Sequence, residues 1–105
     1  MLLSTTDIIA GKEIVETIGL VKGNSVQSRN IGRDMMAGLR NIVGGEMKEY
    51  AEMLTRSREI ATQAMEEEAR RLGANGIVAV RFSTSSVMDG TSEVLAYGTA
   101  VRVKE

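Results

Sequence analysis

The stretch "IVAVRFSTSSVMDGTSEVLAYGTAVRV", residues 77–103, decides the fold because it reads as two strands joined by a turn. Residues 77–83 and 93–103 are rich in β-branched and aromatic side chains, which is typical of strands. The Asp-Gly pair at 89–90 is typical of a turn between antiparallel strands. We therefore expect this end of the chain to form a β-hairpin.

Two helices are expected before the hairpin. The longer should run from Glu46 to Leu72, because apolar residues recur there at helical spacing and Gly73 can end a helix. The shorter should begin at Asn30, a good N-cap, and end at Gly44-Gly45. Its apolar face comprises Ile31, Met35, Leu39 and Ile42.

Strands are also expected near the N-terminus. Residues 13–23 are rich in Ile, Val and Thr and are followed by the turn signal Gly23-Asn24. Residues 25–30 could extend this strand or form a loop, and residues 2–5 could form a short strand. The 105 residues fit a single domain, 1–105. We expect an α+β fold: a β-α-β-β two-layer sandwich with an antiparallel sheet, one short helix and one long helix.

The predicted strands are apolar on both faces. Leu95, Tyr97, Val101 and Val103 alternate with Val94, Ala96 and Ala100; Val78, Val80 and Phe82 are grouped on one face, as are Ile14, Ile18 and Leu20. Because both helices should lie on one side of the sheet, the other side needs cover. We expect a second copy to provide it, although the N-terminal segment or long side chains could do so in a monomer.

Glycines interrupt two of these strands. Gly19 and Gly98 each predict either a close approach by a neighbouring element or a β-bulge.

Composition excludes several classes of function. A net charge of −1 and three aromatic residues argue against a nucleic-acid-binding surface. The chain has no Cys and no His, which excludes thiol catalysis, disulfides and the usual ligands of soft metals. The N-terminal residues lack a basic region and no apolar run reaches membrane-spanning length. We expect a cytoplasmic protein with no membrane partner.

The candidate ligand site lies between the first strand and the long helix. Lys22, Arg29, Arg33 and Arg40 outnumber Asp34 and give residues 22–40 a local charge of +3. Beside a helix N-terminus such a cluster could bind an anion. It could equally form ion pairs between subunits or remain solvated. The predicted ligand-binding residues are Arg29, Arg33, Asp34, Arg40, Glu46 and Tyr50.

Two other functions remain open from the residues. An enzyme could share an active site between subunits, using Arg33, Asp34, Glu46 or Tyr50. Alternatively, Glu46 and Glu49 could bind a hard cation such as calcium, because carboxylates suit such ions. Hydroxyls at Ser83–Ser86 lack a nearby base and are interpreted as a polar strand end. The sequence identifies no catalytic residue, metal ligand or cofactor.

Three segments, residues 19–54, 73–86 and 93–101, closely resemble the YbjQ-like family of small prokaryotic proteins. The most specific stretch is IGRD…GLRNIVGGE, residues 31–46. The resemblance implies a dodecin-subunit-type core assembled as a ring-like homo-oligomer, a pentamer. The family carries a heavy-metal-binding label, which this Cys-free and His-free sequence does not fit. We expect a non-enzymatic, oligomeric module that binds a small ligand or a partner.

Overall fold

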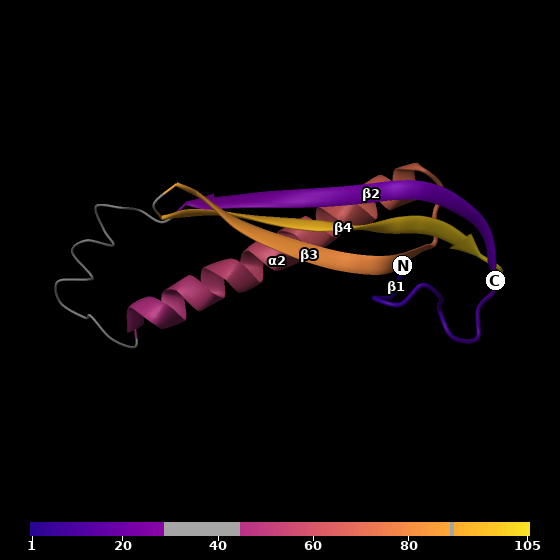
Figure 1. The fold of residues 1–105 in the computed structure, drawn as a ribbon, viewed down its shortest axis with the longest axis horizontal. Coiled ribbons are helices and arrows are strands. Elements are labelled where there is room, and N and C mark those ends of the chain that lie inside the picture. The colour runs from indigo at the N-terminus through magenta and orange to yellow at the C-terminus, as the bar shows by residue number, and fades with distance from the viewer. Residues whose placement is uncertain (29–44, 89) are drawn as a thin grey trace.

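The computed structural model describes residues 1–28, 45–88 and 90–105, with side chains along the helix described from Lys48 onward. It contains β1 (Leu2–Leu3), β2 (Ile14–Ser28), α2 (Gly45–Arg71), β3 (Gly76–Met88) and β4 (Thr91–Val103). Helix α2 crosses one face of the sheet obliquely, so the molecule has two layers (Figure 1). The α+β class and the long helix are confirmed. The predicted short helix lies outside the described residues.

The sheet has the strand order β1-β3-β4-β2. Strands β2, β4 and β3 are antiparallel, as predicted, and β3 and β4 form the expected hairpin. Short strand β1 instead runs parallel to β3. The prediction of a wholly antiparallel sheet was therefore wrong, and the sheet is mixed.

Strand β2 does not end at Gly23-Asn24, as predicted, but continues to Ser28. Gly23 is buried beneath α2. A Cβ atom at this position would overlap the Ala61 carbonyl oxygen and the Met65 backbone nitrogen. The glycine thus serves close packing between helix and strand and not a turn.

A β-bulge in β3 corrects the predicted faces of that strand. Val78 pairs with Thr99 and Arg81 pairs with Tyr97, so β3 has one extra residue there. Ala79, in the bulge, has a positive φ of 54°. Beyond it, Val80 faces the helix although Val78 faces the opposite side.

Phe82 follows Val80 on the helix side, because it pairs with Ala96 of the helix-side core. The grouping of Val78, Val80 and Phe82 on one face was therefore wrong. Gly98 lies against the bulge, where a Cβ atom would be 2.8 Å from Ile77 Cγ2 and 3.0 Å from the Val78 carbonyl oxygen.

Two register shifts, between Ile14 and Glu16 and between Thr17 and Gly19, do the same in β2. Ile18 packs against the helix-side core, whereas Ile14 packs on the opposite face. The predicted common face of Ile14, Ile18 and Leu20 was wrong for Ile18. Of the two predicted alternatives, Gly19 lies at a β-bulge, and Gly98 lies at a close approach, opposite the bulge of β3.

The core has two parts. The main cluster lies between α2 and the sheet and comprises Val21, Ala61, Met65, Ala69, Ala74, Ile77, Val80, Val94, Ala96 and Ala100. On the opposite face, which we call the outer face, a small cluster of Val78, Val101 and Val103 is covered by Ile9 and Ile14. The N-terminal segment thus covers one end of the outer face.

Farther along, the outer face is mixed in character. Leu20 is 65% exposed and Tyr97 is 36% exposed. They lie beside exposed Lys22 and Asn24 and half-buried Glu93 on the same face. The prediction of an apolar second face holds fully at the covered end, whereas beyond it the exposed apolar side chains of Leu20, Val26 and Tyr97 alternate with polar ones.

The N-terminal segment is held by backbone hydrogen bonds to β3. The Ser4 amide donates to the Ile77 carbonyl at 2.9 Å, and the Val80 amide donates to the Ser4 carbonyl at 3.0 Å. The Ala79 amide donates to the Thr6 carbonyl at 2.8 Å. These bonds satisfy backbone groups that the bulge would otherwise leave unpaired.

Candidate functional site

Of the predicted ligand-binding residues, Arg29, Arg33, Asp34 and Arg40 lie outside the described residues. Glu46 lies at the start of α2, but its side chain is also outside them. Tyr50, by contrast, can be placed. The charged side chains of the predicted site all lie outside the described part of the structure, so that set stays a prediction.

Tyr50 joins the helix to the sheet. Its hydroxyl lies 3.1 Å from Ser92 Oγ of β4, and the side chain is half-buried. This contact lies near the ends of α2 and β2 that flank residues 29–44 in the chain. The predicted basic segment therefore starts and ends at the end of the molecule where Tyr50 lies.

Several other hydroxyls lie at this end, those of Ser25 and Ser57 between helix and sheet and that of Thr91 on the outer-face side of the register. Ser57 Oγ donates to the Ser25 carbonyl oxygen at 3.5 Å, and Gln27 Nε2 donates to Ser25 Oγ at 3.1 Å. Thr91 Oγ1 lies 3.0 Å from Ser28 Oγ. We call Ser25, Tyr50, Ser57, Thr91 and Ser92 the hydroxyl cluster. All of its members except Tyr50 are buried.

The face that α2 turns to the sheet becomes more polar toward the N-terminal end of the helix, although Met53 is buried there between Tyr50 and Ser57. Ala61, Met65 and Ala69 contact the main core, whereas Ser57 and Tyr50 continue the same face at helical spacing toward the N-terminal end of α2. Sequence reasoning missed Ser57 because only apolar residues were counted in the predicted buried stripe of the helix. The spacing of Tyr50, Ser57 and Ala61 was the available signal.

The hydroxyl cluster is neutral in its side chains. Hydroxyl groups both donate and accept hydrogen bonds, and in this arrangement they bond to one another and to the backbone. Chemically, such a set can hold a polar group by hydrogen bonding.

A second feature is a shallow groove of about 490 Å³ beside β3, which we call the Phe82 groove. Its lining residues are Thr55, Arg58, Glu59, Thr62, Gln63, Glu66 and Phe82. The ring of Phe82 is 47% exposed there. Opposite the ring, Arg58 Nη2 donates to Thr55 Oγ1 at 3.2 Å. The groove thus combines an uncovered aromatic ring with a charged helix face.

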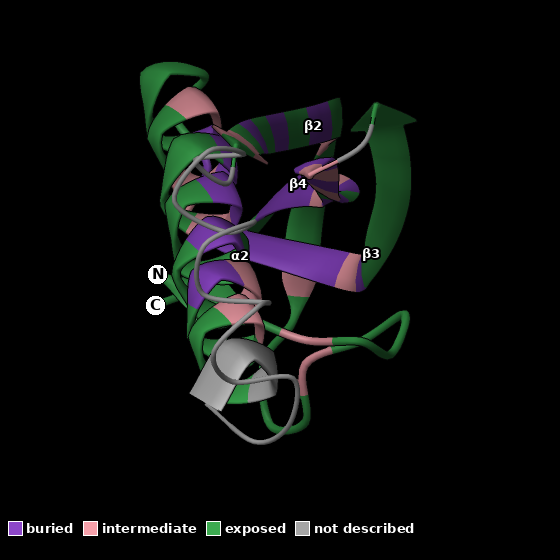
Figure 2. Cartoon of the chain, turned by 90° about the vertical axis from the view of Figure 1, so that its left-hand side faces the viewer, coloured by how far each residue is buried: buried purple, intermediate pink, exposed green. Residues whose placement is uncertain are grey.

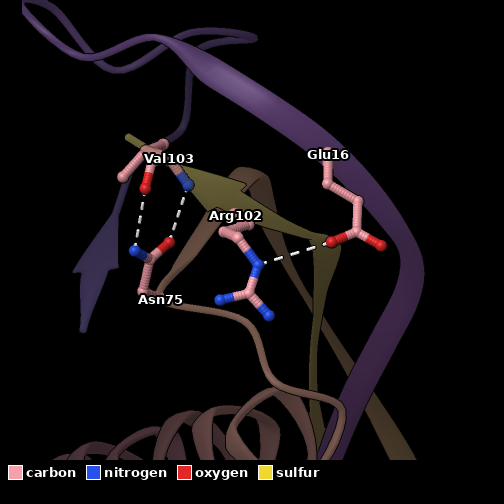
Figure 3. A network of polar contacts seen from close by, with 4 residues as sticks. All are labelled: Glu16, Asn75, Arg102 and Val103. Carbon is pink, nitrogen blue, oxygen red and sulfur yellow. Dashed lines mark hydrogen bonds and ion pairs between the residues drawn. The ribbon is translucent and has the colours of Figure 1, made fainter. Parts of the chain in front are cut away.

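The polar network at the other end of the sheet is structural (Figure 3). The Val103 amide donates to Asn75 Oδ1 at 2.7 Å, and Asn75 Nδ2 donates to the Val103 carbonyl at 3.0 Å. Arg102 Nε lies 3.4 Å from Glu16 Oε1 in an exposed ion pair. Such a pair contributes little to stability. The two Asn75 bonds fix the turn after α2 to the last strand.

The comparisons with known proteins identify the family. The model of the YbjQ family, described as "Putative heavy-metal-binding", matches residues 1–104. This chain belongs to the YbjQ family. A UPF0145 protein of Vibrio parahaemolyticus is 58% identical over 105 residues, covering 100% of both chains. One from the archaeon Halorubrum lacusprofundi is 58% identical over 104 residues, covering 99% of this chain and 100% of its own.

A solved structure supports the fold of this YbjQ-family chain. A protein of the DUF74 family from Pediococcus pentosaceus superposes with a TM-score of 0.67 at 20% identity, covering 99% of this chain and 98% of its own. At this identity the likeness establishes the fold alone. No helix in the described part of the chain is both long and apolar enough to cross a bilayer.

The residues of this YbjQ-family member do not fit a heavy metal. Thiolate and imidazole are the ligands that soft and borderline metals prefer, and the sequence contains no Cys and no His. Within residues 1–28, 45–88 and 90–105, no three acidic residues come together as a possible metal site. We therefore assign no step or site to a heavy metal.

Proposed function

We propose that this chain is a subunit of a cytoplasmic, ring-like homo-oligomer, a pentamer, and that the assembly binds a small ligand or a partner at its subunit seams without catalysing a reaction. The family resemblance supplies the ring and its size. The observation that carries the proposal is the exposure of apolar side chains on the outer face, above all Leu20 at 65%. Such groups are commonly covered in an assembly.

The dimensions of the chain support the same proposal. Its Cα radius of gyration is 17.4 Å, compared with about 13 Å for a compact domain of this length. The Cα trace extends over 56 × 22 × 16 Å. A subunit this elongated exposes more surface than a compact domain, so it gains more from contacts with neighbouring copies.

The chemistry at the Tyr50 end supports binding over catalysis. The hydroxyl cluster supplies hydrogen-bond donors and acceptors, and the predicted basic residues Arg29, Arg33 and Arg40 would add positive charge. A neutral polar lining with nearby cations suits a small ligand that carries hydroxyl, carbonyl or anionic oxygen atoms.

Light scattering coupled to size exclusion, followed by native mass spectrometry of protein from cell extract, tests the proposal. Five subunits of 11.3 kDa should give about 56 kDa, with additional mass from any retained ligand. A stable 11.3 kDa species at dilute concentration would refute the assembly.

A surface variant tests whether the outer face is covered. Leu20→Glu should reduce the measured mass, since the carboxylate could not be buried against a neighbour without a large penalty. The fold should persist because the Leu20 side chain is largely exposed. Glu67→Lys on the exposed helix face is the matched charge-changing control and should keep the wild-type mass.

A further inference from the structure

The second half of β3 presents an unusually open strand edge. On one side, residues Arg81–Met88 pair with β4. On the other, the backbone bonds of the N-terminal segment reach Val80, and the Arg81 side chain donates to the Thr5 carbonyl at 2.7 Å. The described part of the chain supplies no strand beyond that point. All eight residues from Arg81 to Met88 are exposed. Figure 2 shows this half of β3 as exposed, in contrast to the buried half near α2.

This edge lacks the devices that usually protect such strands. Proline, lysine and inward-pointing charges commonly prevent an edge from pairing with another chain. The sequence RFSTSSVM contains none of these, and Arg81 is its only charged residue. The register with β4 is regular from Arg81 to Ser86. An unprotected edge of this length is suited to β-augmentation by an added strand.

The Phe82 groove lies alongside this edge. Phe82 faces the helix side of the sheet, and its half-exposed ring forms one wall of the groove opposite α2. A strand added to the edge would place alternate side chains over this side of the sheet. An apolar side chain from that strand would cover the ring, so the edge offers a backbone template and an aromatic contact together.

The chain itself carries a complementary edge. Strand β2 forms the opposite border of the sheet and, among the described residues, pairs with β4 only. From Leu20 to Ser28 its register is regular over nine residues, long enough to match the open part of β3. Lys22 is the only charged residue in this stretch. One open edge at each border allows copies to join head to tail, which is the contact type that closes into rings.

We propose that the Arg81–Met88 edge of β3 pairs with the Leu20–Ser28 edge of β2 in the next copy, so that one sheet continues across each subunit seam and the Phe82 groove is completed by the neighbour. This inference rests on the proposed homo-oligomer and specifies its seam. The occupant of the edge is a second copy, because this chain supplies a long open strand of its own.

Engineered disulfides test the pairing directly, because the chain has no cysteine of its own. Double variants combine Ser83→Cys or Ser85→Cys with Lys22→Cys or Asn24→Cys. Within one copy, β2 and β3 are separated by β4, so their Cα atoms lie about 10 Å apart, beyond disulfide reach. A disulfide must therefore join two copies. We expect at least one double variant to form covalent multimers on non-reducing gels.

The matched control places the second cysteine on the exposed helix face, as Ser85→Cys with Glu67→Cys, and should remain uncrosslinked. If the chain is an oligomer but no β2–β3 double variant forms multimers, this seam is refuted while the proposed assembly stands. A monomeric wild-type chain would refute both.

Proline substitutions provide an independent test. Successive backbone amides of a strand point to opposite sides, so of Thr84→Pro and Ser85→Pro one removes a bond to β4 and the other removes a donor at the open edge. The variant that removes a donor at the open edge should keep the wild-type circular dichroism spectrum and lose the oligomeric mass. If both proline variants fold and keep the wild-type mass, the pairing is contradicted. If both variants unfold, the disulfide experiment decides.

Discussion

Gly23 and Met65 lie in direct backbone contact between strand β2 and helix α2. A Cβ atom at Gly23 would overlap the Met65 amide nitrogen and lie 2.8 Å from the Ala64 Cβ. Neither the helix backbone nor Ala64 can rotate aside, as a long side chain could. The closest approach of the two layers therefore depends on a missing side chain.

The first prediction is that Gly23→Ala destabilises the fold by about 1–3 kcal/mol or more, because the methyl group must push the two layers apart. Urea denaturation measures the change. Gly76→Ala is the graded comparison, since its Cβ would meet the flexible end of Ile9 at 3.2 Å and no helix backbone. A Gly23 variant no less stable than the Gly76 variant would contradict the close contact.

The second prediction concerns Ala79 in the β3 bulge, whose φ is 54°. An alanine in this left-handed region is strained by about 1–2 kcal/mol, and glycine is not. Ala79→Gly should therefore be neutral or stabilising by up to about 1 kcal/mol, although glycine normally weakens a strand. Ala79→Val should destabilise, because a β-branched residue is least tolerated at positive φ.

Thermal unfolding of the two Ala79 variants beside the wild type gives the measurement. If Ala79→Gly lowers the melting temperature as much as Ala79→Val does, the bulge does not hold the strained conformation.

The fold class could be predicted from the sequence because the long helix and the hairpin each have a clear periodic pattern. The helix over Gly45–Arg71 and the hairpin over residues 76–103 follow from spacing and from the Asp-Gly turn. The side-chain faces were less predictable. Strict alternation put Phe82 with Val78, whereas one extra residue at Ala79 reverses the positions from Val80 to Ser86.

The candidate site was even less predictable from the sequence than the side-chain faces. Of the predicted set, the structure places the side chain of Tyr50 alone, and its partner Ser92 lies 42 residues away in the chain. A lone serine in a strand carries no periodic signal, so only the packing of α2 on β4 reveals the pair. Gly23 was misread for a similar reason, because a glycine that permits close packing looks the same in sequence as one that makes a turn.

The third prediction follows from the absence of soft ligands. Zinc or cadmium titrated into the purified protein should give no saturable binding heat and no rise in melting temperature. As a positive control, Glu67→His with Arg71→His places two imidazoles one helical turn apart on an exposed face and should create zinc-dependent stabilisation. Tight, saturable binding of cadmium to the wild-type chain would contradict the prediction.

The fourth prediction tests the hydroxyl cluster through Tyr50 and Ser92. Tyr50→Phe removes the phenolic hydroxyl and retains the ring, and Ser92→Ala removes its partner at 3.1 Å. Each should lower the free energy of unfolding by about 0.5–1.5 kcal/mol, the usual net value of a hydrogen bond. Because both variants delete the same bond, the double variant should be less destabilised than the sum of the two, by about 0.5 kcal/mol or more.

Urea denaturation of all four proteins completes the cycle, with Thr55→Ala as a control hydroxyl on the exposed helix face. Strict additivity would mean that the Tyr50 hydroxyl does not join helix to sheet, and the hydroxyl cluster would then lose its link to the segment of predicted basic residues.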